Sequence, residues 1–113
     1  MGKTIAYFKE WMASISYGKK LSMDGVGKIT YASDIDLDCY IQGTLTKVVN
    51  DKGEEVVSTE QIYLDGENAT VIAIDFGDRF NTGTIIKPKY RPIKSIGKFY
   101  DEDGVMDLVV IYL

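Results

Sequence analysis

The chain has 113 residues, enough for one domain with a hydrophobic core of its own, and no second domain is expected. It contains no histidine and one cysteine, Cys39, so it lacks the commonest metal ligand and the usual general base near neutral pH. A single cysteine also excludes an internal disulfide. We therefore expect no enzyme, no cofactor and no metal, although a pair of catalytic carboxylates stays open. The net charge of −4 argues against binding nucleic acid over the whole surface.

The composition favours a β-rich fold over a helix bundle, because glycine, tyrosine, threonine, isoleucine and valine are abundant. The longest apolar runs extend over only a few residues, so we expect no segment to span a membrane. Met1–Thr4 lacks the apolar run of a signal peptide, and the protein is expected to be intracellular when it is made.

Charge is distributed in blocks along the chain. Residues 34–78 contain two basic and eleven acidic residues, whereas residues 79–100 contain six basic residues and no acidic ones. Two interpretations stay open. The blocks are ordinary solvated faces, or they are acidic and basic surfaces that meet across a subunit boundary.

Residues 1–13 are expected to form an N-terminal arm or a short helix. Ile5, Phe8 and Met12 are spaced as on one face of an amphipathic helix over Thr4–Met12. A helix this short is marginal in water, so its apolar face must dock, either on its own sheet, which we favour, or on a neighbouring molecule.

Two strands joined by a turn are predicted next. Ser14–Tyr17 alternates small polar and apolar residues, Asp24–Gly27 has the composition of a turn, and Lys28–Tyr31 returns from it. In Asp34–Asp38 the carboxylates alternate with apolar residues, which indicates the start of another strand with its acidic side facing water.

A long hairpin is predicted over Cys39–Gly66. β-Branched and aromatic residues fill both of its arms, and Asn50–Gly53 has the polar residues and glycine that a reversal needs. The ends of the hairpin, Cys39–Ile41 and Ile62–Leu64, read as core strands, whereas residues 43–59 are too polar for a core and are expected to project. Cys39 itself reads as a small buried hydrophobe. The residues expected to face inward along the first arm and the approach to it are Ile35, Leu37, Cys39, Ile41, Gly43 and Leu45.

The remaining chain alternates turns and short strands. The predicted turns are Asp65–Asn68, Asn81–Gly83 and Asp101–Gly104. The predicted strands are Thr84–Ile86, Ile93–Tyr100 and Val105–Leu113, and Val71–Ile74 is a short strand or a connector packed on the core. The last strand is apolar at almost every position, which is typical of a central strand buried on both faces.

The basic stretch Lys87–Lys98 contains two prolines, Pro88 and Pro92, on either side of Lys89–Arg91. Proline has no backbone N–H to donate, which predicts an edge strand or a loop. The interpretation we prefer is a solvated edge protected by lysines. The alternatives are a surface that contacts phosphates and a surface that contacts an acidic partner or neighbouring subunit. The residues that would make such subunit or partner contacts are Lys87, Lys89, Tyr90, Arg91, Lys94 and Lys98.

Several weak motifs in a fixed order resemble the small head–tail connector proteins of tailed bacteriophages and prophages, also called minor capsid, head-closure or stopper proteins. The resemblance covers roughly residues 14–113. The segments that carry it are Val48–Ser58, Ile62–Gly66, Asp78-Arg79, Ile93, Ile96, Asp101–Gly104 and the hydrophobic C-terminal strand.

The resemblance implies a mainly β fold, a small β-barrel or sandwich of antiparallel strands with a long central hairpin. It also implies a structural virion protein without catalysis, assembled in the bacterial host cytoplasm. Such a protein forms a ring that joins the portal or adaptor to the tail, and it can be monomeric when isolated. In stopper proteins a loop carried by the middle strands projects into the channel and helps to hold back the packaged DNA.

That loop matches residues 43–59 of this chain. The residues that would face the channel are Asp51, Lys52, Gly53, Glu54, Glu55 and Glu60. Their excess of carboxylates would repel DNA phosphates rather than bind them. The alternative function is a small β-barrel adaptor that binds nucleic acid or a peptide through Lys87–Lys98.

Overall fold

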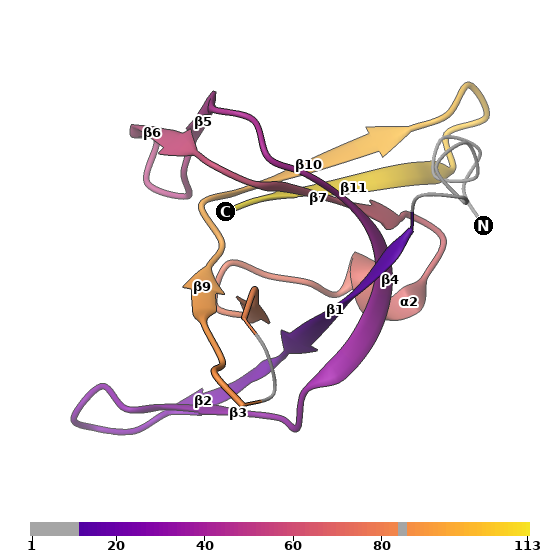
Figure 1. Cartoon of the computed structure of the whole chain (residues 1–113). Coiled ribbons are helices and arrows are strands. Elements are labelled where there is room, and N and C mark those ends of the chain that lie inside the picture. Colours follow the sequence, from indigo (N-terminus) through magenta and orange to yellow (C-terminus); the bar gives the residue numbers. More distant parts are fainter. Residues whose placement is uncertain (1–11, 84–85) are drawn as a thin grey trace.

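The computed structural model describes residues 12–83 and 86–113, and in these the protein is a curled antiparallel sheet that forms half a barrel, with one short helix (Figure 1). The predicted mainly β fold is thereby confirmed. The predicted helix over Thr4–Met12 lies outside the described residues except for Met12. No helix in the described ranges is long and apolar enough to cross a membrane.

The elements follow one another with short connections. In chain order they are β1 (Ala13–Gly18), β2 (Lys20–Met23), β3 (Ile29–Tyr31), β4 (Ile35–Gln42), β5 (Thr46–Val49), β6 (Glu55–Ser58), β7 (Gln61–Asp65), α2 (Ala69–Ile72), β8 (Arg79–Asn81), β9 (Tyr90–Pro92), β10 (Ser95–Tyr100) and β11 (Met106–Tyr112).

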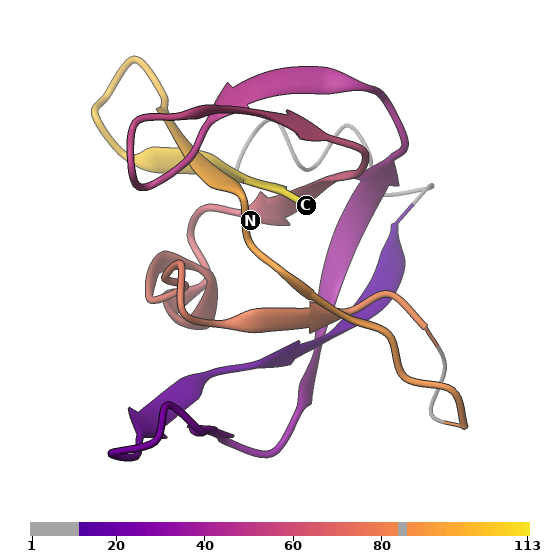
Figure 2. The same ribbon diagram turned by 90° about the vertical axis from the view of Figure 1, so that its left-hand side faces the viewer.

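Within the described ranges, seven strands form the main sheet in the order β10-β11-β7-β4-β1-β8-β9, and each neighbouring pair is antiparallel. Strands β2–β3 and β5–β6 form two separate two-stranded ribbons that extend from this sheet (Figures 1 and 2). Strand β9 is at one edge, as its prolines predict, because a proline has no N–H for a second neighbour. Strand β11 lies between β10 and β7, which confirms its predicted central position.

The hydrophobic core lies on the concave face of the sheet. Its buried residues are Ile15, Tyr17, Leu37, Cys39, Ile62, Leu64, Val71, Ile74, Phe80, Ile93, Val109, Ile111 and Leu113. The intervening residues of β11, Leu108 and Val110, face the other side and pack with Met12 and with tyrosines of β4, β7 and β11. The C-terminal strand is apolar at almost every position because residues on both of its faces are buried.

The inward alternation predicted for the first arm of the long hairpin holds at Leu37 and Cys39 but is wrong at its two ends. Ile35 is 45% exposed, Ile41 40% and Leu45 77%. The chain leaves the main sheet after Gln42, so the inner face ends there and Leu45 lies in a connection between sheets. Ile35, at the other end of β4, lines an open hollow of about 440 Å³ beside α2.

One segment that was predicted as a strand or a connector does not form a strand. The chain over Val71–Ile74 contributes to the helix α2, where the side chain of Asn68 accepts a hydrogen bond from Thr70 N at 2.9 Å and caps the first turn. Val71 and Ile74 are buried, so the alternative of a connector packed on the core is confirmed. The predicted strand over Thr84–Ile86 falls partly outside the described residues, and Ile86 lies in a bend.

A buried carboxylate joins the bend between β1 and β2 to the loop before β8. Asp78 is 2% exposed. It accepts hydrogen bonds from Tyr17 Oη at 2.5 Å, from the backbone N of Lys20 and of Asp75 at 2.8 Å each, and from Lys19 Nζ at 3.1 Å. The carboxylate thus joins the end of β1 and the start of β2 to the loop before β8.

These contacts shift both pKa values of the buried pair. Burial by itself raises the pKa of Asp78, but the hydrogen bonds from Tyr17, from the two backbone amides and from Lys19 outweigh it, and the pKa lies below its usual 3.8. The pKa of Tyr17 is raised, first by burial and then by its hydrogen bond to the carboxylate. The phenol therefore stays protonated and remains a donor.

The first prediction concerns this hydrogen bond. Replacing Tyr17 with Phe leaves the buried carboxylate one donor short, so the free energy of unfolding should fall by about 1–3 kcal/mol. Denaturant unfolding of the purified protein measures this. Tyr100→Phe is the control, because Tyr100 is 59% exposed and its change should lie within about 0.5 kcal/mol. Equal effects in the two variants would contradict the role of Asp78.

The second prediction concerns acid. Because the folded pKa of Asp78 is depressed, its contribution to stability is present above the unfolded value of 3.8 and is lost as the pH falls through the lower folded pKa. Asp78→Asn should be less stable at neutral pH and lose less further stability on acidification below pH 3.8. Thermal unfolding of both proteins across this range tests the prediction, and parallel pH profiles would contradict it.

Candidate functional site

The long hairpin is divided into a part inside the main sheet and a part outside it. Its lower part pairs β4 with β7, from Cys39↔Leu64 to Gln42↔Gln61. Its upper part pairs β5 with β6 as a separate ribbon, from Thr46↔Ser58 to Val49↔Glu55. In Figure 1 this ribbon extends beyond the main sheet. The middle of the hairpin, β5 and β6, is thus paired outside the main sheet, whereas Ile41, at a predicted core end, is 40% exposed and Ser58, in the predicted middle, is buried.

The tip of the ribbon is a tight turn built by Asn50. Its side-chain oxygen accepts hydrogen bonds from the backbone N of Lys52 and Glu54, each at 2.9 Å. Gly53 has a φ of +80°, a conformation that glycine adopts without strain. All five residues that follow Asn50 are exposed; they are Asp51, Lys52, Gly53, Glu54 and Glu55. The tip thus presents three carboxylates and one ammonium group to solvent.

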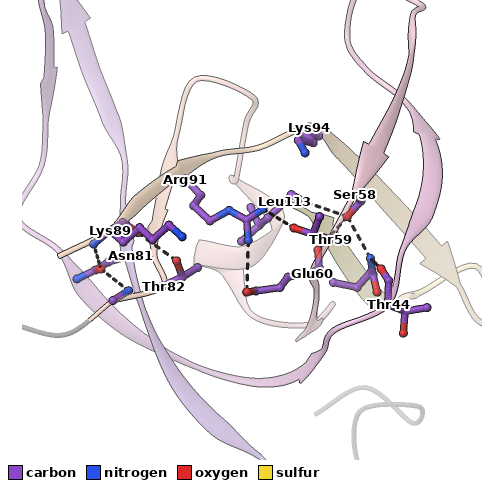
Figure 3. Close-up of polar contacts among 12 residues, drawn as sticks. Thr44, Ser58, Thr59, Glu60, Asn81, Thr82, Lys89, Arg91, Lys94 and Leu113 are labelled. Atoms are coloured by element: carbon purple, nitrogen blue, oxygen red, sulfur yellow. Dashed lines mark hydrogen bonds and ion pairs between the residues drawn. The ribbon is translucent and has the colours of Figure 1, made fainter. Parts of the chain in front are cut away.

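A buried polar cluster holds the base of the ribbon (Figure 3). The hydroxyl of Ser58, fully buried, shares its hydrogen between the carbonyl oxygens of Glu60 at 2.9 Å and Leu113 at 3.0 Å. Gln61 Nε2 donates to Thr44 O at 2.7 Å and to Ser58 Oγ at 3.1 Å. The two chain segments that leave the sheet are therefore tied to each other and to the C-terminal strand.

Two basic side chains reach the same base from the stretch after β8 (Figure 3). Arg91 Nη2 donates to Thr59 Oγ1 at 2.6 Å, and Nη1 lies 3.3 Å from Glu60 Oε1. Lys94 Nζ donates to the carbonyl oxygen of Val57 at 2.6 Å. The structure thus brings together the hairpin and the basic stretch, which were predicted as two separate sites.

This arrangement changes how the predicted site residues divide. Glu60 lies at the base of the ribbon, beside Arg91, and not among the exposed residues of the tip. Arg91 and Lys94 are engaged within the chain. The remaining predicted contact residues, Lys87, Lys89, Tyr90 and Lys98, are exposed. Whether any of them meets a channel or a partner stays a prediction.

A cluster around Arg79 was not predicted as a functional site. Its guanidinium carbon lies 3.9 Å from the ring centroid of Tyr31 and 3.7 Å from that of Tyr90, so two tyrosines contact one cation. Tyr90 Oη donates to Asp34 at 3.0 Å, and this bond raises the pKa of Tyr90. These residues come from three distant parts of the chain, so no local motif reveals the cluster.

The cysteine and the possible metal ligands of the described residues do not form a second candidate site. Cys39 is fully buried, as predicted, and burial together with the charge of Asp38 raises the pKa of its thiol to about 12. In residues 12–83 and 86–113, no group of cysteine and carboxylate side chains is arranged to hold a metal ion. The exposed hairpin, with its base, is therefore the candidate site that the geometry brings forward.

A third prediction tests the base of the hairpin. Arg91→Met keeps an unbranched apolar side chain but removes the donors to Thr59 and Glu60. Amide hydrogen exchange across residues 46–58 should then accelerate roughly fivefold, which corresponds to a loss of about 1 kcal/mol. Lys98→Met removes the same charge from the edge strand β10 and should leave exchange in the ribbon unchanged. Unchanged exchange in the Arg91 variant would refute the anchoring role.

No protein-family model matches the chain, and no curated protein or solved structure matches it. The resemblance to phage head–tail connectors consequently rests on the sequence motifs alone. What the chain does is argued below from its geometry and charge.

Proposed function

We propose that this protein is a structural component of the head–tail interface of a tailed bacteriophage or prophage. It forms a ring that joins the portal or adaptor to the tail, and its β5–β6 ribbon projects toward the DNA channel and helps to close it. The proposal makes it a virion protein that acts by assembly, without a cofactor or catalysis.

The observation that carries the proposal is the β5–β6 ribbon on its fixed base. A projection that blocks or guides DNA must keep its direction while its tip stays accessible. Ser58 and Gln61 are buried at the base, whereas Asp51, Glu54 and Glu55 are exposed at the tip. The salt bridge and the hydrogen bond of Arg91 add a further support from outside the hairpin.

The charge of the tip also supports a conduit. Asp51, Glu54 and Glu55 outnumber Lys52, so the tip repels the phosphates of a passing duplex. Weak contact between the tip and DNA suits a channel through which the DNA must move. A basic tip would bind the phosphate backbone and slow the DNA.

The open sheet supports assembly. Strands β10 and β9 are its two edges in the described residues, and Phe99 and Tyr100 on β10 are 49% and 59% exposed. Exposed edges of this kind invite pairing or covering by another chain. A closed ring covers such surfaces on every subunit in the same way.

The alternative of a nucleic-acid or peptide adaptor is less well supported. It requires the cations of Lys87–Lys98 to be available to a ligand. Arg91 and Lys94, in the middle of that stretch, are bonded to the hairpin base of the same chain. The lysines at positions 87, 89 and 98 are exposed.

A fourth prediction tests the tip in phage particles. Removal of the chain from the phage or prophage that encodes it should leave DNA-filled heads that lose DNA and do not join tails. Glu54→Lys should slow the release of DNA from completed particles, because an attractive contact replaces a repulsive one. DNA release is followed by the fluorescence of an intercalating dye.

The control raises the net charge equally at another ribbon. Ser22→Lys with Thr30→Lys adds two positive charges on β2–β3, where both residues are exposed and paired with each other. Release should stay at the wild-type rate in this variant. Heads that join tails normally without the chain, or a reconstruction that places residues 43–59 on the outer circumference of the ring, would refute the proposed function.

A further inference from the structure

The cation of Arg79 lies in a surface hollow of about 290 Å³ between the β2–β3 ribbon and strand β9. Two arginines, Arg79 and Arg91, line this hollow together with the rings of Tyr31 and Tyr90. The two rings contact the guanidinium of Arg79 at centroid distances of 3.9 and 3.7 Å, which restricts the group to one orientation. An arginine held in this way loses little conformational freedom when it binds a ligand.

The charge of Arg79 has no carboxylate partner among the described residues. Its Nε is buried and makes no hydrogen bond. The two nearby carboxylates are engaged elsewhere: Asp34 accepts from Tyr90, and Asp78 accepts from Tyr17, Lys19 and two amides. The positive charge of the guanidinium is thus not neutralised by an ion pair within the described residues, so the hollow favours a ligand that brings a negative oxygen.

The same protein carries exposed carboxylates in the turn between β10 and β11. The turn between β10 and β11 holds Glu102 and Asp103, both exposed. The side chain of Asp101 accepts hydrogen bonds from Asp103 N at 2.9 Å and Val105 N at 3.0 Å, which holds the turn in one conformation. In both views this turn and the β2–β3 ribbon lie at opposite ends of the molecule (Figures 1 and 2).

We propose that the hollow around Arg79 is a docking site for the acidic β10–β11 turn of a second copy of this chain, with Asp103 as the carboxylate that meets the guanidinium. The contact joins opposite ends of two identical molecules, so it repeats from copy to copy and generates a ring or a filament. It names the subunit contact of the proposed ring and rests on that proposal.

A carboxylate fits the site better than a nucleic-acid backbone. The planar fork of arginine matches a carboxylate with two hydrogen bonds. A longer polyanion would also meet Asp78 in the wall of the hollow and Glu60 beside Arg91, and these charges repel phosphates. The carboxylate of Asp103 is carried on a narrow turn, so it can meet the guanidinium without a chain of further phosphates along the hollow.

The first test is disulfide trapping with the purified full chain. Pro92 lines the hollow and is exposed, and Glu102 is exposed beside Asp103 on the turn. Pro92→Cys mixed with Glu102→Cys, which keeps Asp103, should give a disulfide-linked dimer on mild oxidation, and the double variant should give a ladder. Cys39 is fully buried and does not interfere. Asp51→Cys, at the hairpin tip, replaces Glu102→Cys in the control and should give no dimer with Pro92→Cys.

The second test measures self-association by sedimentation over a range of protein concentrations. Asp103→Asn and Arg79→Gln should each weaken association by about tenfold or more, as expected for loss of a charged hydrogen bond. Lys47→Gln, at an exposed position on β5, should leave it unchanged. Asp103 is exposed on a turn, so its variant keeps the fold even if the Arg79 variant does not.

No trapped dimer and no self-association that depends on Asp103 would overturn the proposal. Binding of inorganic phosphate or of a short single-stranded oligonucleotide that Arg79→Gln abolishes, without self-association, would overturn it in favour of a phosphate site. Both tests use the purified chain alone. If heads join tails without the protein, the proposed function is refuted, but the contact between copies can still be measured. If joining requires the protein but the purified chain shows neither the trapped dimer nor association that depends on Asp103, only the contact is refuted.

Discussion

The buried carboxylate of Asp78 is the constraint on which much of this structure depends. It is almost inaccessible, yet it stays ionised because four donors surround it. Those donors lie at the end of β1, in the bend after it, at the start of β2 and in the loop that leads into β8. The carboxylate therefore fixes the direction in which the β2–β3 ribbon leaves the sheet. It also fixes the start of β8, where the next residue is Arg79.

This placement connects the core to the surface cluster. Because β8 begins directly after Asp78, Arg79 is held at a set distance from the β2–β3 ribbon, and its guanidinium reaches the rings of Tyr31 and Tyr90. The glycine at position 18 makes room for it. A Cβ there would lie 2.7 Å from an oxygen of Asp34 and 3.4 Å from Arg79 Nε. The cluster around Arg79 is thus formed by contacts between residues that are distant in the sequence.

The hairpin follows a different principle. Its tip is formed by local interactions, since Asn50 bonds to amides two and four residues further along. Its base is formed by long-range interactions. Ser58 donates a hydrogen bond to Leu113, and Arg91 donates one to Thr59. A locally built tip on a base held by distant strands is a projection whose chemistry can change without disturbing the fold.

The sequence by itself determined the β-rich class, the turns at Asn50–Gly53 and Asp101–Gly104, and the central place of the last strand, because turn chemistry and apolar pattern act over neighbouring residues. It also determined that the hairpin has core ends and a polar middle. Only the tertiary structure decided that Ile41 and Leu45 are exposed, that Glu60 pairs with Arg91, and that Arg79 meets two tyrosines. The reason is physical: the face on which a residue is buried and the partner that its charge meets are set by which distant strands lie beside it, and no local pattern encodes that.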